Sequence, residues 1–184
     1  MIGELPRSLC VNGASYPINS DYRIVLNLFD ALNTDELTNL DKAYLTVRTL
    51  YDGNIPDRDF VEAVKRAYWF IGGGDIPKTE PSRVKLIDWR HDESMIFSAV
   101  NKTAGSEVRC MKYLHWWSFL GYLSEAGEGL FSTVINIRSK LASGKKRDKW
   151  ELEFIRKHKE LVILRTPQEQ REIEEMEEFL KTIT

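Results

Sequence analysis

Apolar residues recur every three to four positions along most of this sequence, the spacing that places them on one face of an α-helix. Clusters rich in glycine, proline, asparagine and aspartate interrupt this pattern and are typical of helix ends and turns. The pattern predicts a mostly α-helical fold: a multi-helix bundle with a short N-terminal β-hairpin and a charged helical C-terminal extension. The expected helices cover residues 21–32, 41–51, 57–71, 92–104 (or from 88), 108–123, 130–142, 148–161 and 167–183.

The hairpin prediction rests on Asn12-Gly13, which lies between two short β-capable runs within residues 8–18. Both residue types tolerate the positive φ angles of a tight hairpin turn. Pro17 has no N–H to donate to a strand ladder, so the second strand should be short or lie at an edge.

Short polar side chains stand where most of the helices should begin, and such side chains accept hydrogen bonds from the free N–H groups of a first helical turn. The predicted N-cap residues are Ser20 or Asp21, Asp41, Asp57, Asp88 or Asp92, and Asp148. Pro167 would open the last helix at a position where its missing N–H costs little.

The segment around residues 108–123 is the most aromatic part of the chain, and its apolar positions keep helical spacing around much of the circumference. We therefore expect it to form the central buried helix. Trp116 and Trp117 would point about 100° apart, so one should belong to the core and the other to a helix groove or subunit interface. His115 fits a buried neutral imidazole better than a catalytic base, because the sequence offers it no nucleophile.

Glycine and proline divide the chain at its middle. Gly72-Gly73-Gly74 should end the third helix, and residues 75–86 contain Pro77 and Pro81 and would form a linker or an ordered loop. The predicted organisation is a hairpin with helices at 1–74, an aromatic helical core at 87–144 and a charged extension at 145–184, with a single domain as the alternative.

Charge is spread unevenly although the formal net charge is only −2. Residues 134–165 hold ten Lys and Arg against four Asp and Glu, whereas residues 166–184 hold two against six. These segments are either two solvated helix faces, or the acidic segment packs on the basic one of its own or a neighbouring copy. A narrow apolar stripe on the acidic segment favours a docking or oligomer seam; it consists of Ile173, Met176, Leu180 and Ile183.

The sequence shows no catalytic motif, so we expect no enzyme and no bound cofactor or metal. His91-Asp92-Glu93 fits the acidic start of a helix better than a metal site. The two cysteines, Cys10 and Cys110, are far apart and should be reduced, partly buried thiols. No signal peptide and no run of 18 apolar residues is present, so a membrane location is not expected.

Nucleic-acid binding is the weaker interpretation of the basic run Lys145–Lys149 and the Trp150 that follows it. Such residues could contact phosphates and stack on bases. The run is short and interrupted by an acid, however, and the chain is slightly acidic overall. A solvated loop and helix start is the preferred interpretation.

Four segments resemble the bacteriophage gene-product-fifteen family in order and spacing over roughly residues 8–160. Tyr113–Phe119 is similar to the family's His-Trp-Trp-x-Phe hallmark, and Ile18–Arg23 to its N-terminal Ile-Asn-x-Asp-Phe-Arg element. Asp88-Trp89 with the helix that follows, and Val134–Arg138, resemble two further elements. Thr103–Glu107 departs from the Tyr-Gly-Ile-Asp-Leu-like turn that the family tends to carry. The residues carried over as motif and interaction residues are His115, Trp116, Trp117, Phe119, Asp21, Arg23 and Arg138.

The resemblance implies a non-enzymatic bacteriophage or prophage protein that works in the host bacterial cytoplasm. Genes of this family typically lie between those for the major tail protein and the tape measure protein, where tail assembly chaperones are encoded. We therefore expect a helical tail assembly chaperone that self-associates and binds the tape measure protein through helix-groove contacts. The alternative is a structural component of the virion, such as a tail or connector protein; an enzyme or nucleic-acid-binding factor is the third hypothesis.

Overall fold

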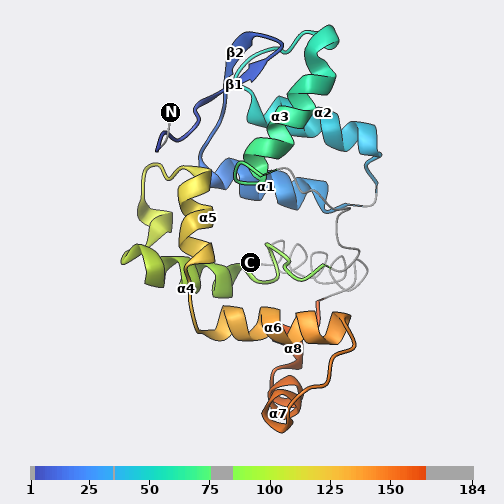
Figure 1. Ribbon diagram of the computed structural model, residues 1–184, viewed down its shortest axis with the longest axis vertical. Coiled ribbons are helices and arrows are strands. Elements are labelled where there is room, and N and C mark those ends of the chain that lie inside the picture. Colours follow the sequence, from blue (N-terminus) through green and yellow to red (C-terminus); the bar gives the residue numbers. More distant parts are fainter. Residues whose placement is uncertain (1–2, 35, 76–84, 165–184) are drawn as a thin grey trace, which may run out of the picture. The chain divides into compact units, whose positions relative to one another are not determined.

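The computed structural model describes residues 3–34, 36–75 and 85–164 (Figure 1). Within them the chain forms eight α-helices, two short 3-10 helices and one two-stranded antiparallel hairpin. This confirms the predicted fold class, a mostly helical protein with an N-terminal β-hairpin. None of the helices in this part of the chain combines the length and apolar character needed to cross a lipid bilayer.

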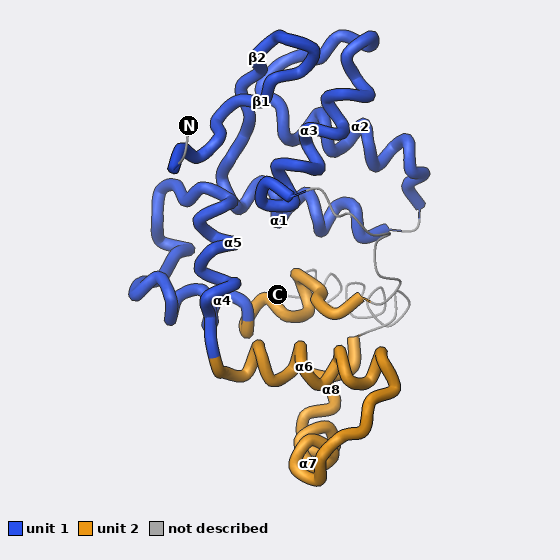
Figure 2. The backbone as a smooth tube through the Cα atoms, viewed as in Figure 1, with its two compact units in different colours: residues 1–83, 96–127 blue, residues 84–95, 128–184 orange. Residues whose placement is uncertain are grey.

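The chain divides into two compact units, coloured separately in Figure 2. Unit 1 comprises residues 1–83 and 96–127, and unit 2 comprises residues 84–95 and 128–184. The four-part division drawn from the sequence stays a prediction, and most of its linker, residues 76–84, lies outside the described residues.

Unit 1 begins with the hairpin of β1 (Ser8–Val11) and β2 (Ala14–Pro17). Asn12 and Gly13 have φ angles of 47° and 88°, so both turn residues adopt the left-handed conformation that the sequence predicted. The strand alternation buries Leu9 and Val11, whereas Cys10 points outward and is exposed. Cys110 is exposed as well, so the expectation of partly buried thiols was wrong.

Helices α1 (Tyr22–Leu32), α2 (Asn39–Leu50) and α3 (Phe60–Ile71) complete the first half of unit 1. Asp21 caps α1 by accepting a hydrogen bond from the N–H of Arg23. Thr38, not Asp41, caps α2, and Asp41 closes a capping box from the third helical position, because a Thr-x-x-Asp pair satisfies two free N–H groups reciprocally. A short 3-10 turn, Asp57–Asp59, precedes α3.

The second half of unit 1 holds most of α4 (Glu93–Ala104), a 3-10 turn at Val108–Cys110, and α5 (Trp116–Ser124). The single buried helix expected over 108–123 was therefore wrong in its first half. Residues 111–115 are not helical, because the backbone at the end of this segment pairs with residues 20–22: Tyr22 donates to the Leu114 carbonyl and Trp116 donates to the Ser20 carbonyl. Backbone bonds to a distant segment here outweigh helical spacing.

Unit 2 contains α6 (Leu130–Ala142), α7 (Lys149–Lys157) and the short α8 (Lys159–Val162), which packs against both α6 and α7. Asp148 is the N-cap of α7, as predicted, and forms a capping box with Glu151. The helix expected over 148–161 breaks at His158, whose φ and ψ of −130° and 43° are not helical. The helix predicted from Pro167, with the stripe at Ile173, Met176, Leu180 and Ile183, lies outside the described residues.

Candidate functional site

The residues singled out from the sequence fall into two groups of contacts, one inside each unit. His115, Trp116, Trp117 and Phe119 lie with Asp21 and Arg23 in unit 1, and Arg138 lies in unit 2. No metal-binding cluster of three or more His, Cys, Asp or Glu side chains occurs among the described residues.

His115 caps the helix that carries the motif. Its Nδ1 accepts a hydrogen bond from the N–H of Trp117 at 3.0 Å, and its Nε2 lies 2.9 Å from the Pro6 carbonyl oxygen. Because Nδ1 accepts, Nε2 carries the proton and donates to Pro6. Burial lowers the pKa of His115 below its ordinary value, with the nearby Arg7 acting in the same direction and the bond to Pro6 opposing them. This is the buried neutral imidazole that the sequence suggested, with both nitrogens satisfied by backbone.

The two tryptophans bind the end of α3. The indole N–H of Trp116 donates to the Ile71 carbonyl at 2.9 Å, and that of Trp117 donates to the Phe70 carbonyl at 2.8 Å. The last carbonyls of a helix have no partner within the helix, so the tandem tryptophans supply donors to two of them. The motif therefore joins α5 to α3.

Trp116 is the core member of the pair, as one of them was predicted to be. It is 1% exposed and stacks on Phe119, with ring centroids 5.7 Å apart. Phe119 in turn stacks on Tyr22 of α1 at 4.7 Å, in nearly parallel planes. The row of three rings packs α5 against α1 and forms the centre of the unit 1 core.

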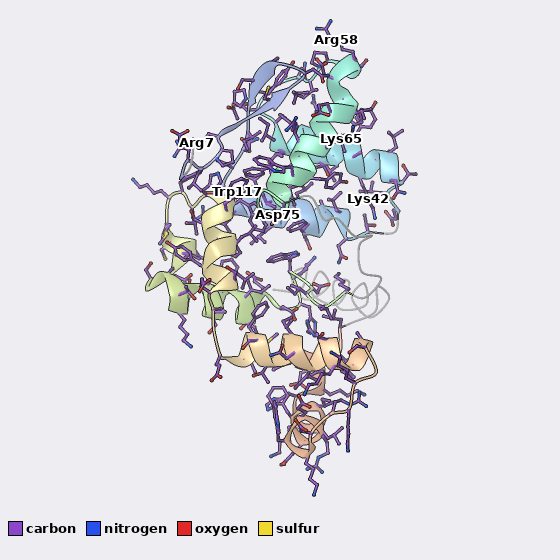
Figure 3. The ribbon with its side chains drawn as sticks, viewed as in Figure 1. Arg7, Lys42, Arg58, Lys65, Asp75 and Trp117 are labelled. Atoms are coloured by element: carbon purple, nitrogen blue, oxygen red, sulfur yellow. The ribbon has the colours of Figure 1, made fainter. Side chains whose placement is uncertain are left out.

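Trp117 is partly exposed and lies against Trp69 and Phe70, with ring centroids 5.2 and 6.1 Å away. Figure 3 labels Trp117 and also Asp75, which directly follows the glycine run. A Cβ atom on Gly74 would stand 3.1 Å from the Trp117 ring, and Gly74 has a φ of 99°. The glycine run is thus required twice, by the turn that ends α3 and by the ring that packs on it.

Asp21 and Arg23 hold the extended segment before the motif. Asp21 pairs with Arg23 at 3.1 Å and accepts a hydrogen bond from the N–H of Leu114 at 3.2 Å. The Arg23 guanidinium also donates to the carbonyls of Arg109 and Met111. The Ile18–Arg23 element and the segment that carries the His-Trp-Trp-x-Phe element are therefore two halves of one contact.

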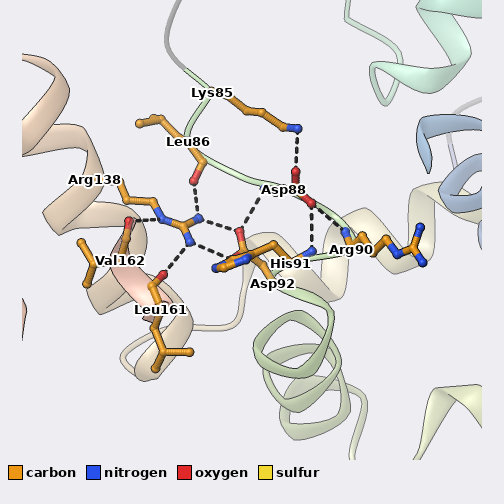
Figure 4. Close-up of polar contacts among 9 residues, drawn as sticks. All are labelled: Lys85, Leu86, Asp88, Arg90, His91, Asp92, Arg138, Leu161 and Val162. Atoms are coloured by element: carbon orange, nitrogen blue, oxygen red, sulfur yellow. Dashed lines mark hydrogen bonds and ion pairs between the residues drawn. The ribbon is translucent and has the colours of Figure 1, made fainter. Parts of the chain in front are cut away.

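Arg138 makes the corresponding contact in unit 2 (Figure 4). Its guanidinium forms a two-pronged ion pair with Asp92, at 2.6 and 2.8 Å, and both side chains are buried. Its remaining N–H groups donate to backbone carbonyls of Leu86, Leu161 and Val162. One side chain thus joins the start of α4, α6 and α8, because guanidinium has five donors in a fixed plane.

The residues around Asp92 continue this network. Asp88 accepts hydrogen bonds from the N–H groups of Arg90 and His91 and pairs with Lys85 at 2.7 Å. Burial opposes ionisation of Asp88, but these hydrogen bonds outweigh it and lower its pKa. Both ring nitrogens of His91 are buried, and neither has a hydrogen-bond partner among the described residues. The prediction of an acidic helix start for residues 91–93 fits this arrangement.

An exposed apolar surface of unit 1 lies on α3, on part of the face that the spacing of its residues makes apolar. At 100° per residue, Phe60, Val61, Val64, Tyr68 and Ile71 fall within a 100° arc of α3 beside the buried Ala63, Ala67 and Phe70. The signal in the sequence is the total width of the apolar positions on α3: the exposed and the buried ones together span about half the helix.

Helix α2 extends that surface. Tyr44 stacks on Phe60 at 4.3 Å between ring centroids, and Leu40 lies one turn from Tyr44. The side chains of Val61 and Leu40 are 67% and 61% exposed, and Tyr44 and Tyr68 are exposed as well. We call these side chains the α2–α3 patch; it consists of Leu40, Tyr44, Phe60, Val61 and Tyr68.

The geometry thus defines a helical protein whose signature residues hold its own elements together and whose α2–α3 patch is exposed. The sequence profile of the family described as bacteriophage Gp15 protein matches residues 1–164. The chain belongs to this family, and it is therefore a bacteriophage protein, as the resemblance implied. Searches of curated proteins and of solved structures find no match.

Proposed function

We propose that this protein is a tail assembly chaperone that acts in the host cytoplasm, where it binds helices of the tape measure protein and associates with further copies of itself. The observation that carries the proposal is the α2–α3 patch, a surface of exposed apolar side chains on two contacting helices. Membership of a bacteriophage family supports the setting. The gene order that the resemblance implies is the ground for naming the tape measure protein as the partner.

The hallmark residues make contacts within their own chain, and this affects which surface can bind the tape measure protein. Trp116 and Phe119 are buried. Trp117, the tryptophan expected in a helix groove or subunit interface, is bonded to α3 of its own chain and does not present a free docking ring. The α2–α3 patch takes over that role in the proposal. An amphipathic helix laid across it would cover Val61 and Tyr68 with its apolar face.

The test is co-expression with the tape measure protein, followed by pull-down and light scattering. We expect a soluble complex with several copies per tape measure chain. Val61→Asp with Tyr68→Asp should weaken binding by about 2 kcal/mol or more, roughly thirtyfold, because a desolvated carboxylate would replace each apolar contact. Leu130→Asp is the matched control: Leu130 is exposed in unit 2 and starts α6, where an aspartate is tolerated.

A monomer that ignores the tape measure protein would contradict the proposal and favour the second candidate, a structural component of the virion. Loss of binding in Leu130→Asp equal to that in the patch variant would show that the α2–α3 patch is not the docking surface.

A further inference from the structure

Unit 2 carries a set of cations that its described residues do not neutralise. Arg138, Lys140 and Lys157 are paired, with Asp92, Glu151 and Glu153 respectively. By contrast, five exposed cations lie on α7 or directly beside it and have no carboxylate partner in the described part of the chain. We call them the α7 basic surface: Lys145, Lys146, Lys149, Arg156 and Lys159.

Apolar side chains accompany these charges on the same helix. Trp150 and Leu152 are 56% and 52% exposed, although α7 buries Glu151 against Lys140. Lys149 and Arg156 are seven residues apart and so project from the same side of the helix. A partner that fits this surface therefore has to offer both carboxylates and apolar side chains.

The segment 166–184 of this chain has that composition. It holds six acids against two cations, and its apolar residues Ile173, Met176, Leu180 and Ile183 keep heptad-like spacing. Glu172 and Glu177 flank that stripe on a helical projection. The segment begins two residues after Leu164, close behind α8, and α8 packs against α7.

We propose that residues 166–184 dock on the α7 basic surface of their own chain. A tether of a few residues gives the segment an effective concentration in the millimolar range, which favours the contact within one chain over the same contact between copies. Duplex nucleic acid fits the surface less well, because its outward-facing phosphates offer no apolar group to cover Leu152. An acidic helix with apolar side chains can also cover Trp150 and Leu152.

The test is hydrogen exchange of the full chain at about 10 mM and about 1 M salt, across which the Debye length falls from roughly 30 Å to 3 Å. We expect peptides from 166–184 to be protected at low salt and to lose that protection at high salt. Lys149→Glu with Arg156→Glu should lower the protection about tenfold at low salt. Adding Glu172→Lys and Glu177→Lys to this variant should restore it.

Lys112→Glu is the control, because Lys112 is an exposed cation of unit 1; it should leave the exchange of 166–184 unchanged. Unchanged exchange of α6 in unit 2, and of α1 to α3 in unit 1, shows that the fold is intact in every variant. Protection that is absent at low salt, or that survives the charge reversal, overturns the proposal. So does protection that rises with protein concentration together with the particle mass, which would mean docking between copies. Binding of duplex DNA that disappears on charge reversal, with 166–184 unprotected, would assign the surface to nucleic acid instead.

Discussion

Arg138 shows how much one buried side chain can organise. It neutralises Asp92 and donates hydrogen bonds to carbonyls of two other segments. Its removal therefore leaves a buried carboxylate and several carbonyls without their partner at once. Breaking a buried ion pair on one side is costly, whereas replacing both partners with apolar residues is often tolerated. The buried contacts of Arg138 therefore give this motif residue a role in stability.

Arg138→Leu should lower the free energy of unfolding by about 3–5 kcal/mol, because it leaves the Asp92 carboxylate buried without a counter-charge. Urea denaturation followed by circular dichroism measures this. Adding Asp92→Leu should recover part of the loss. Lys157→Leu removes an exposed ion pair with Glu153 and serves as the control, with an expected change within about 0.5 kcal/mol. Equal losses in both single variants would contradict the argument.

His115 links the fold to pH. Burial lowers its folded-state pKa below the unfolded value, so the unfolded chain binds more protons as the pH falls. The stability from the neutral ring is complete above the unfolded pKa, near 6.5. It is lost progressively as the pH falls from there towards the folded pKa.

His115→Asn should remove that part of the pH dependence while keeping an acceptor for the Trp117 N–H. The measurement is the unfolding free energy of the parent and the variant at several values between about pH 7.5 and 5. Their difference should shrink as the pH falls. His158→Asn, which changes a partly exposed ring outside the motif, should not reproduce this trend. A difference that stays constant across the range would show that His115 does not titrate as described.

At the scale of elements, the junction between α3 and α5 depends on the glycines that end α3 as much as on the tryptophans of α5. The indoles of Trp116 and Trp117 reach the carbonyls of Ile71 and Phe70 only because the chain leaves α3 through glycines. A side chain at position 74 would need a strained φ and would meet the Trp117 ring.

Gly74→Ala should destabilise the protein by about 2 kcal/mol or more, from backbone strain and the clash together. Gly13→Ala is a matched control: its φ of 88° is similar, but nothing lies within 4 Å of the added Cβ. It should cost about 1 kcal/mol. Thermal unfolding of both variants, alone and with Trp117→Leu, isolates the clash. The penalty at Gly74 should fall in the Trp117→Leu background and the penalty at Gly13 should not.

At the scale of the whole molecule, the two candidate functions differ in where the protein is once the phage particle is complete. A chaperone that holds the tape measure protein leaves as the tail tube assembles, whereas a virion component stays. The α2–α3 patch suits transient contact, because apolar surface that is exposed in the free protein is covered only while a partner is bound.

Mass spectrometry of purified particles should therefore find this chain absent or far below the amount of the tail tube subunit. The lysate of the same infected cells should contain it in abundance and supplies the control for expression. A constant amount in the particles, comparable to that of a structural subunit, would identify a virion component and contradict the chaperone proposal.

The sequence by itself determined the features that rest on neighbouring residues. Asn12-Gly13 specified the hairpin turn, Asp21 and Asp148 specified helix starts, and the glycine run specified the end of α3. These succeeded because the hydrogen bonds involved join residues only a few positions apart. The resemblance to the bacteriophage family was also recognised from the sequence alone, and the matching family profile confirmed it.

Only the tertiary structure decided how distant segments share those residues. Residues 111–115 are not helical, against their helical spacing, because the backbone around Leu114 bonds to residues 20–22, some ninety positions away. Similarly, the width of the apolar arc on α3 was visible in the sequence, but which half is covered depends on the helices that pack there. Periodicity reports that a face is apolar; only packing determines whether another part of the chain covers it.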